Sequence, residues 1–88
     1  MINKREEFLI FAAESTQLVI KAEKILKEVG IECRIIPLPK EIDASCGLAI
    51  RTELQNLEKV QKIFEENEMD LKRYKVEKIG FKKKIDKY

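Results

Sequence analysis

Cys46 is the residue whose type and position offer the most chemistry in this chain. It stands between Ser45 and Gly47, at the end of a polar connection that begins at Pro37 and separates two short apolar segments. The 88-residue sequence contains no His, no Gly-rich phosphate loop and no clustered set of metal-ligand residues. We therefore expect no cofactor and no metal, and a reactive group that is a single thiol presented by a loop.

Length and composition predict one small domain. A chain of 88 residues buries only about 60 to 65% of its unfolded surface, which leaves little stability to support a deep substrate pocket. Hydrophobic residues make up 44% and charged residues 39%, as in a globular domain. The net charge of +2 gives no argument for nucleic acid. We expect one ferredoxin-like domain over residues 1–80 and a basic C-terminal tail over residues 81–88.

The sequence also predicts a cytoplasmic protein. It has no apolar run of about 18 residues, so we expect no membrane segment, and its N-terminal stretch is too polar for a secretory signal. Two cysteines in a reducing compartment are expected to stay as thiols. A structural bridge between Cys33 and Cys46 is the alternative.

Hydrophobic periodicity predicts six elements. They are strands over residues 7–12, 31–37, 47–52 and 70–79, and helices over residues 16–29 and 54–66. This order is the ferredoxin-like βαββαβ plan, an α+β fold in which two helices cover one face of a four-stranded antiparallel sheet. The last strand is charged, which favours an edge position for it.

The predicted topology brings the connection that carries Cys46 to the rim of the sheet where the first helix begins. Ser15 and Thr16 offer hydroxyl groups to cap that helix. Unpaired N–H groups and the positive end of the helix dipole would then lie near the thiol. Both effects lower the pKa of a cysteine.

The charges nearest to Cys46 in the sequence have both signs. Lys40 and Arg51 would stabilise a thiolate, whereas Glu41 and Asp43 would oppose it, so the sign of the local field stays open. Gly47 permits a positive φ that could turn the sulfur outward. An ordinary turn residue at the start of a strand is the other interpretation of this glycine.

Each cysteine could also be a structural residue, because free cysteines are commonly buried. The polar residues 43–45 that precede Cys46 are poor core material and favour a functional thiol. Cys33 falls on the apolar face of its predicted strand, so we expect it in the core. Ile42 is expected to pack back against the domain and fix the long connection.

Two segments resemble a known family. Residues 34–42 (RIIPLPKEI) and 45–51 (SCGLAIR) are similar to the putative selenium/sulfur carrier proteins, and the likeness covers roughly residues 7–74. The position held by Lys40 is usually Arg in that family. Lysine lacks the planar, bidentate donor group of arginine, so it would hold an anion less firmly.

The resemblance implies a small thiol-based carrier in sulfur or selenium metabolism. Cys46 would hold a persulfide or selenosulfide, receive the atom from a desulfurase-like donor and pass it to an acceptor protein. We expect a carrier rather than a stand-alone enzyme. The residues expected to support Cys46 are Gly47, Lys40, Arg51, Ser15 and Thr16.

Other functions stay open at this point. A non-catalytic ferredoxin-like module could bind protein or RNA through the sheet face or the lysines of residues 82–87, although we do not expect nucleic acid as the partner. A metal chaperone is disfavoured because the chain has no Cys-x-x-Cys pair. The sequence does not choose between sulfur and selenium, and a homodimer is compatible with it.

Overall fold

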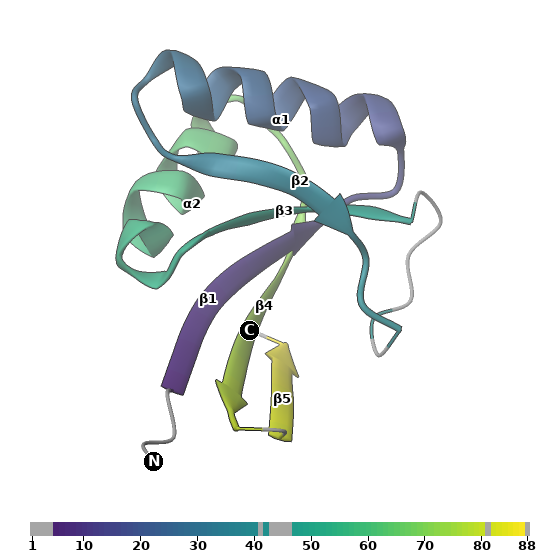
Figure 1. The fold of residues 1–88 in the computed structure, drawn as a ribbon. Coiled ribbons are helices and arrows are strands. Elements are labelled where there is room, and N and C mark those ends of the chain that lie inside the picture. The colour runs from purple at the N-terminus through teal and green to yellow at the C-terminus, as the bar shows by residue number, and fades with distance from the viewer. Residues whose placement is uncertain (1–4, 41, 43–46, 81, 88) are drawn as a thin grey trace.

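A computed structural model gives the fold and describes residues 5–40, 42, 47–80 and 82–87. The chain is an α+β protein, as the sequence predicted (Figure 1). Its elements are β1 (Arg5–Ala12), α1 (Thr16–Glu28), β2 (Cys33–Pro37), β3 (Leu48–Glu53), the 3-10 helix η1 (Leu54–Asn56), α2 (Leu57–Glu66), β4 (Lys72–Ile79) and β5 (Lys82–Lys87).

All described strands belong to one antiparallel sheet with the order β2-β3-β1-β4-β5. β1 is its middle strand, with Ala12 opposite Ala49 of β3 and Phe8 opposite Val76 of β4. The prediction of a four-stranded βαββαβ sheet was wrong in the number of strands, because β5 pairs with β4. The predicted edge position of β4 was wrong for the same reason.

The fifth strand was missed because its composition is typical of a solvated tail. Four of its six residues are lysine and only Ile85 is apolar. Gly80, with a φ of 57°, helps to reverse the chain after β4. Backbone pairing with β4 and the packing of Ile85 opposite Val76 then hold the strand in place.

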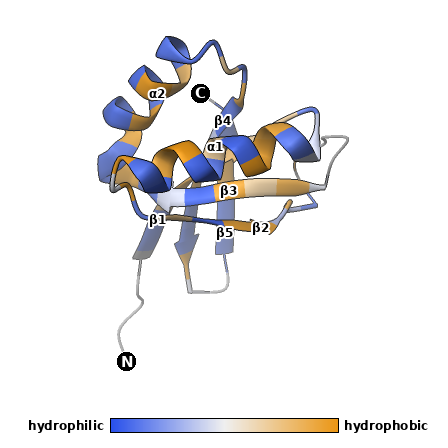
Figure 2. Ribbon diagram, turned by 90° about the horizontal axis from the view of Figure 1, so that it is seen from above, coloured by the Kyte–Doolittle hydropathy of each residue, from blue (hydrophilic) through white to orange (hydrophobic). Residues whose placement is uncertain are grey.

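Both helices pack on one face of the sheet, as predicted, and form the larger core with it. Apolar residues recur along α1 and α2 among polar ones (Figure 2), so each helix buries one side. The ring of Phe11 from β1 meets the ring of Phe64 from α2 edge to face, with 5.2 Å between centroids. The buried helix residues of this core are Val19, Ala22, Leu26, Val60 and Phe64.

A second apolar cluster lies on the opposite face, where the described residues place no helix. Its buried members are Phe8, Ile10, Ala12, Ala49, Val76 and Ile42. Ile10 is only 1% exposed, although it lies on the face without helices. Leu38 and Ile42 from the β2–β3 connection and Ile85 from β5 pack in this cluster. The connection therefore contributes to the second core.

The predicted element boundaries agree closely with the structure. α1 begins at Thr16 as predicted and ends one residue early, with Val29 as its C-cap and Gly30 at a φ of 83°. The segment 54–66 begins as a 3-10 turn before it becomes α2. In the described part of the chain, no helix is both long enough and apolar enough to cross a bilayer.

Candidate functional site

Cys46, the predicted reactive residue, and its neighbour Ser45 lie outside the described residues, so the site is built from the residues around them. The Leu38 N–H donates a 2.9 Å hydrogen bond to the Gly47 carbonyl oxygen. This bond follows the pairing of Pro37 with Leu48 at the end of the β2–β3 ladder. The two ends of the connection are therefore held side by side, and Cys46 is covalently joined to one of them.

The middle of the connection is fixed by Ile42. Its side chain is 5% exposed and belongs to the second apolar cluster, and its N–H donates to the Pro39 carbonyl oxygen at 3.0 Å. Burial of an isoleucine side chain stabilises a fold by about 1.5 to 3 kcal/mol. The prediction that Ile42 packs back against the domain is confirmed.

Gly47 has a backbone conformation that favours glycine. Its φ is 70°, and a Cβ built on it would meet nothing within 4 Å. A side chain at this position would be disfavoured by the backbone angle rather than by crowding. The residue after Cys46 therefore sets the direction in which the chain enters β3.

Ser15 and Thr16 lie on the same rim of the sheet as Gly47. β1 ends at Ala12, opposite Ala49 near the start of β3, and α1 begins just beyond that end (Figure 1). The Ser15 hydroxyl oxygen accepts a 3.2 Å hydrogen bond from the Leu18 N–H, so it caps the helix as predicted. The N–H groups of the first helical residues have no acceptor within the helix, and they give this rim a positive partial charge.

The two predicted cations lie in different places. Lys40 is exposed within the connection itself. Arg51 lies along β3, four residues beyond Gly47, which is a separation of about 14 Å at about 3.4 Å per residue. Its guanidinium carbon is 3.9 Å from the centroid of the Phe8 ring. Phe8 pairs with Glu53, further from the rim, so the Arg51 charge is directed away from Gly47.

The separation weakens any effect of Arg51 at the rim, because charges are screened over about 8 Å at physiological ionic strength. Its influence on Cys46 stays a prediction. The stacking of Arg51 on Phe8 was not predicted from the sequence. The strand register would have indicated this contact, because it places Arg51 opposite Ile10, the neighbour of Phe8 on the same face of β1.

Cys33 is a buried, free thiol, as the sequence predicted for a core cysteine. Its sulfur lies 4.0 Å from the Glu23 carbonyl oxygen. Burial, and then the nearby Glu23 carboxylate, raise the pKa of the Cys33 thiol, while Lys27 lowers it in part. Because the thiolate is the nucleophile, Cys33 is poorly suited to chemistry at neutral pH. The Cys33–Cys46 bridge considered above is not formed.

Metal binding finds no support in the residues whose positions are described. No group of three or more Cys, Asp or Glu side chains there is placed to hold an ion.

A comparison with known families adds the decisive observation. The sequence profile of the family described as "Putative Se/S carrier protein-like" matches residues 8–79. The chain belongs to this family. Comparison with curated proteins and with solved structures gave no significant match.

The Se/S carrier match runs from β1 to the end of β4 and includes both cysteines. It confirms the resemblance that residues 34–42 and 45–51 had indicated. β5 lies beyond the matched residues, so this strand is an addition to the part of the chain that defines the family match.

Proposed function

We propose that this chain carries sulfur or selenium as a persulfide or selenosulfide on Cys46 and delivers it to an acceptor protein. The proposal rests chiefly on membership of the Se/S carrier family, whose match spans Cys46. The burial of Cys33 supports it, because burial raises the pKa of that thiol and leaves Cys46 as the better candidate nucleophile.

The loading step transfers one sulfur atom from a donor cysteine to Cys46. The Cys46 thiolate attacks the outer sulfur of a persulfide on a desulfurase-like donor. A new S–S bond forms on Cys46, the donor's S–S bond breaks, and the donor cysteine leaves as a thiolate. No net oxidation or reduction takes place. When selenium is transferred, the outer atom is selenium. A new S–Se bond then forms on Cys46, and the donor's S–Se bond breaks.

Delivery repeats this exchange in the opposite direction. A thiolate of the acceptor attacks the outer atom, and the Cys46 thiolate leaves. A leaving group of low pKa departs faster. A positive rim would therefore assist both steps, since it favours the thiolate of Cys46.

The surroundings described above support the presentation of Cys46 by a held connection. The Leu38–Gly47 hydrogen bond fixes its base, and the burial of Ile42 fixes its middle. The start of α1 lies on the same rim and would favour a thiolate there through its dipole. We propose supporting roles for Lys40, Gly47, Ser15 and Thr16, and a weaker, screened one for Arg51.

Intact-mass measurement tests the proposal. The purified protein is incubated with a cysteine desulfurase and either cysteine or selenocysteine. We expect a gain of one sulfur or one selenium atom that dithiothreitol removes. The Cys46→Ser variant should gain none, whereas the matched Cys33→Ala variant should load as the wild type does. Loading of Cys46→Ser to the wild-type extent, or no reducible adduct on the wild type, would refute the proposal.

A further inference from the structure

The last two strands carry a large excess of positive over negative charge. Residues 72–87 contain eight Lys and Arg against two acids, a net charge of +6, while the whole chain has +2. Subtracting +6 from +2 leaves −4 for the rest of the chain. We call β4, β5 and their turn the basic hairpin (residues 72–87). It forms a positive edge on an otherwise acidic molecule.

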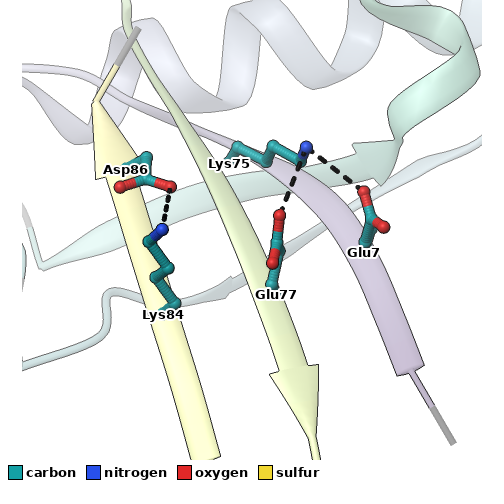
Figure 3. A network of polar contacts seen from close by, with 5 residues as sticks. All are labelled: Glu7, Lys75, Glu77, Lys84 and Asp86. Carbon is teal, nitrogen blue, oxygen red and sulfur yellow. Dashed lines mark ion pairs between the residues drawn. The ribbon is translucent and has the colours of Figure 1, made fainter.

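Both acids of the basic hairpin are engaged on the helix-bearing face of the sheet. The Lys75 Nζ lies 3.3 Å from Glu7 Oε2 on β1 and 3.3 Å from Glu77 Oε1 on β4 (Figure 3). On β5, the Lys84 Nζ lies 3.8 Å from Asp86 Oδ2. The register places Lys75 opposite Asp86 and Glu77 opposite Lys84, so all these hairpin side chains share one face.

On the other face, every charged residue of the basic hairpin is a lysine. These residues are Lys72, Lys78, Lys83 and Lys87, and Lys78 lies directly opposite Lys83. Like charges opposite each other destabilise a strand pair. The Lys78 Nζ lies 5.8 Å from the centroid of the Phe8 ring, and the Lys72 Nζ lies 3.9 Å from Glu14 Oε1 at the other end of β4. The hairpin residues of this face would attract an acidic ligand.

β5 is also an edge strand. It pairs with β4 on one side, and the described residues place no strand on its other side. Alternate residues of such a strand turn their N–H and C=O groups outward, where another strand could bond to them. Lysine occurs on both faces of β5. This composition disfavours pairing with a second copy of the same strand and favours pairing with an acidic one.

A hollow at the turn end of the hairpin provides an apolar contact. It has a volume of about 450 Å³ and is lined by Glu77, Ile79, Lys82, Lys83 and Lys84. Ile79 is 42% exposed there. Lys82 has no ion-pair partner among the residues described. An aliphatic residue surrounded by lysines suits a segment in which acidic and aliphatic residues alternate.

We propose that the basic hairpin docks an acidic, extended segment of another protein, which adds to β5 as a further strand of the sheet. A protein is favoured over RNA because β5 offers no aromatic ring in its described residues, and the one on β4, Tyr74, is half-buried. The docking surface is independent of Cys46 and goes beyond the carrier function.

Fluorescence anisotropy with two labelled peptides tests the docking. One peptide alternates Glu and Val, and the other, of equal length, alternates Lys and Val. We expect only the Glu–Val peptide to bind, and about tenfold weaker binding after the double change Lys82→Glu and Lys87→Glu. The matched control, Lys59→Glu with Lys62→Glu on α2, makes the same charge change on another element and should bind as the wild type does.

Amide hydrogen exchange separates strand addition from simple charge attraction. Peptide binding should slow exchange at alternate residues of β5. Unchanged exchange in the peptide complex would overturn strand addition. Absence of Glu–Val binding at low salt, or equal loss of binding in both double variants, would overturn the docking site. Tighter binding of oligouridine RNA that is lost in Lys82→Glu with Lys87→Glu would overturn the choice of a protein partner. Circular dichroism verifies that each variant is folded.

Discussion

Replacement of Ile42 by alanine tests whether one buried side chain holds the β2–β3 connection in place. Isoleucine-to-alanine changes in a core cost about 2 to 5 kcal/mol. Ile42 is 5% exposed and packs in the smaller of the two apolar clusters, so we expect a value near the lower end, about 2 to 3 kcal/mol. A domain of this size loses about 4 to 8 °C in Tm per kcal/mol, which gives a decrease of about 8 to 24 °C.

Urea unfolding followed by far-UV circular dichroism measures this loss. The Ile42→Ala midpoint should fall while the slope with urea stays the same, because little additional surface is exposed on unfolding. Lys40→Ala is the matched control. It changes an exposed residue of the same connection and should alter the free energy of unfolding by no more than about 0.5 kcal/mol. A loss below about 1 kcal/mol for Ile42→Ala would refute the role assigned to this side chain.

Three further predictions use the same unfolding assay. Gly47→Ala should destabilise the fold by about 1 to 2 kcal/mol, because alanine disfavours a φ of 70°; an unchanged midpoint would contradict this. Ser15→Ala should cost about 0.5 to 2 kcal/mol through the lost cap, whereas Thr16→Ala, next to the cap, should cost less. Burial and Glu23 raise the pKa of the Cys33 thiol, so above about pH 8.5 the folded state holds more protons than the unfolded chain. Stability should therefore fall as the pH rises above that value, and Cys33→Ala should show a shallower decline.

The sequence predicted those parts of the fold that depend on apolar periodicity. The alternation around Cys33 placed it in the core, and the helical spacing that follows Ser15 located α1 to within one residue. The order of strands and helices also placed Gly47 and Ser15 on one rim. These inferences succeed because one buried face leaves a regular pattern in the sequence.

The rest of the fold depends on pairing that leaves little apolar signal. β5 is held by backbone hydrogen bonds to β4 and by the packing of Ile85, which is its one apolar residue. Its four lysines are typical of a solvated tail, so the sequence did not predict a strand there. Because β5 was not predicted, β4 was expected at the edge of the sheet. The short distance in sequence favoured Arg51 as a neighbour of Cys46, but its side chain stacks on Phe8 of the neighbouring strand. Only the register of the sheet reveals such a contact.

The position of β1 in the sheet also has a consequence for synthesis of the chain. β1 precedes the other described strands in the chain and is the middle strand of the sheet, and its residue Phe8 receives its partner on β4 only when Val76 has been added. Until then, one of the most apolar segments of the nascent chain lacks a partner along one side. Pairings between such distant residues slow folding, and the intermediates expose apolar surface that is prone to aggregation. We therefore expect the apolar residues of β1 to be prone to aggregation until β4 has paired with them.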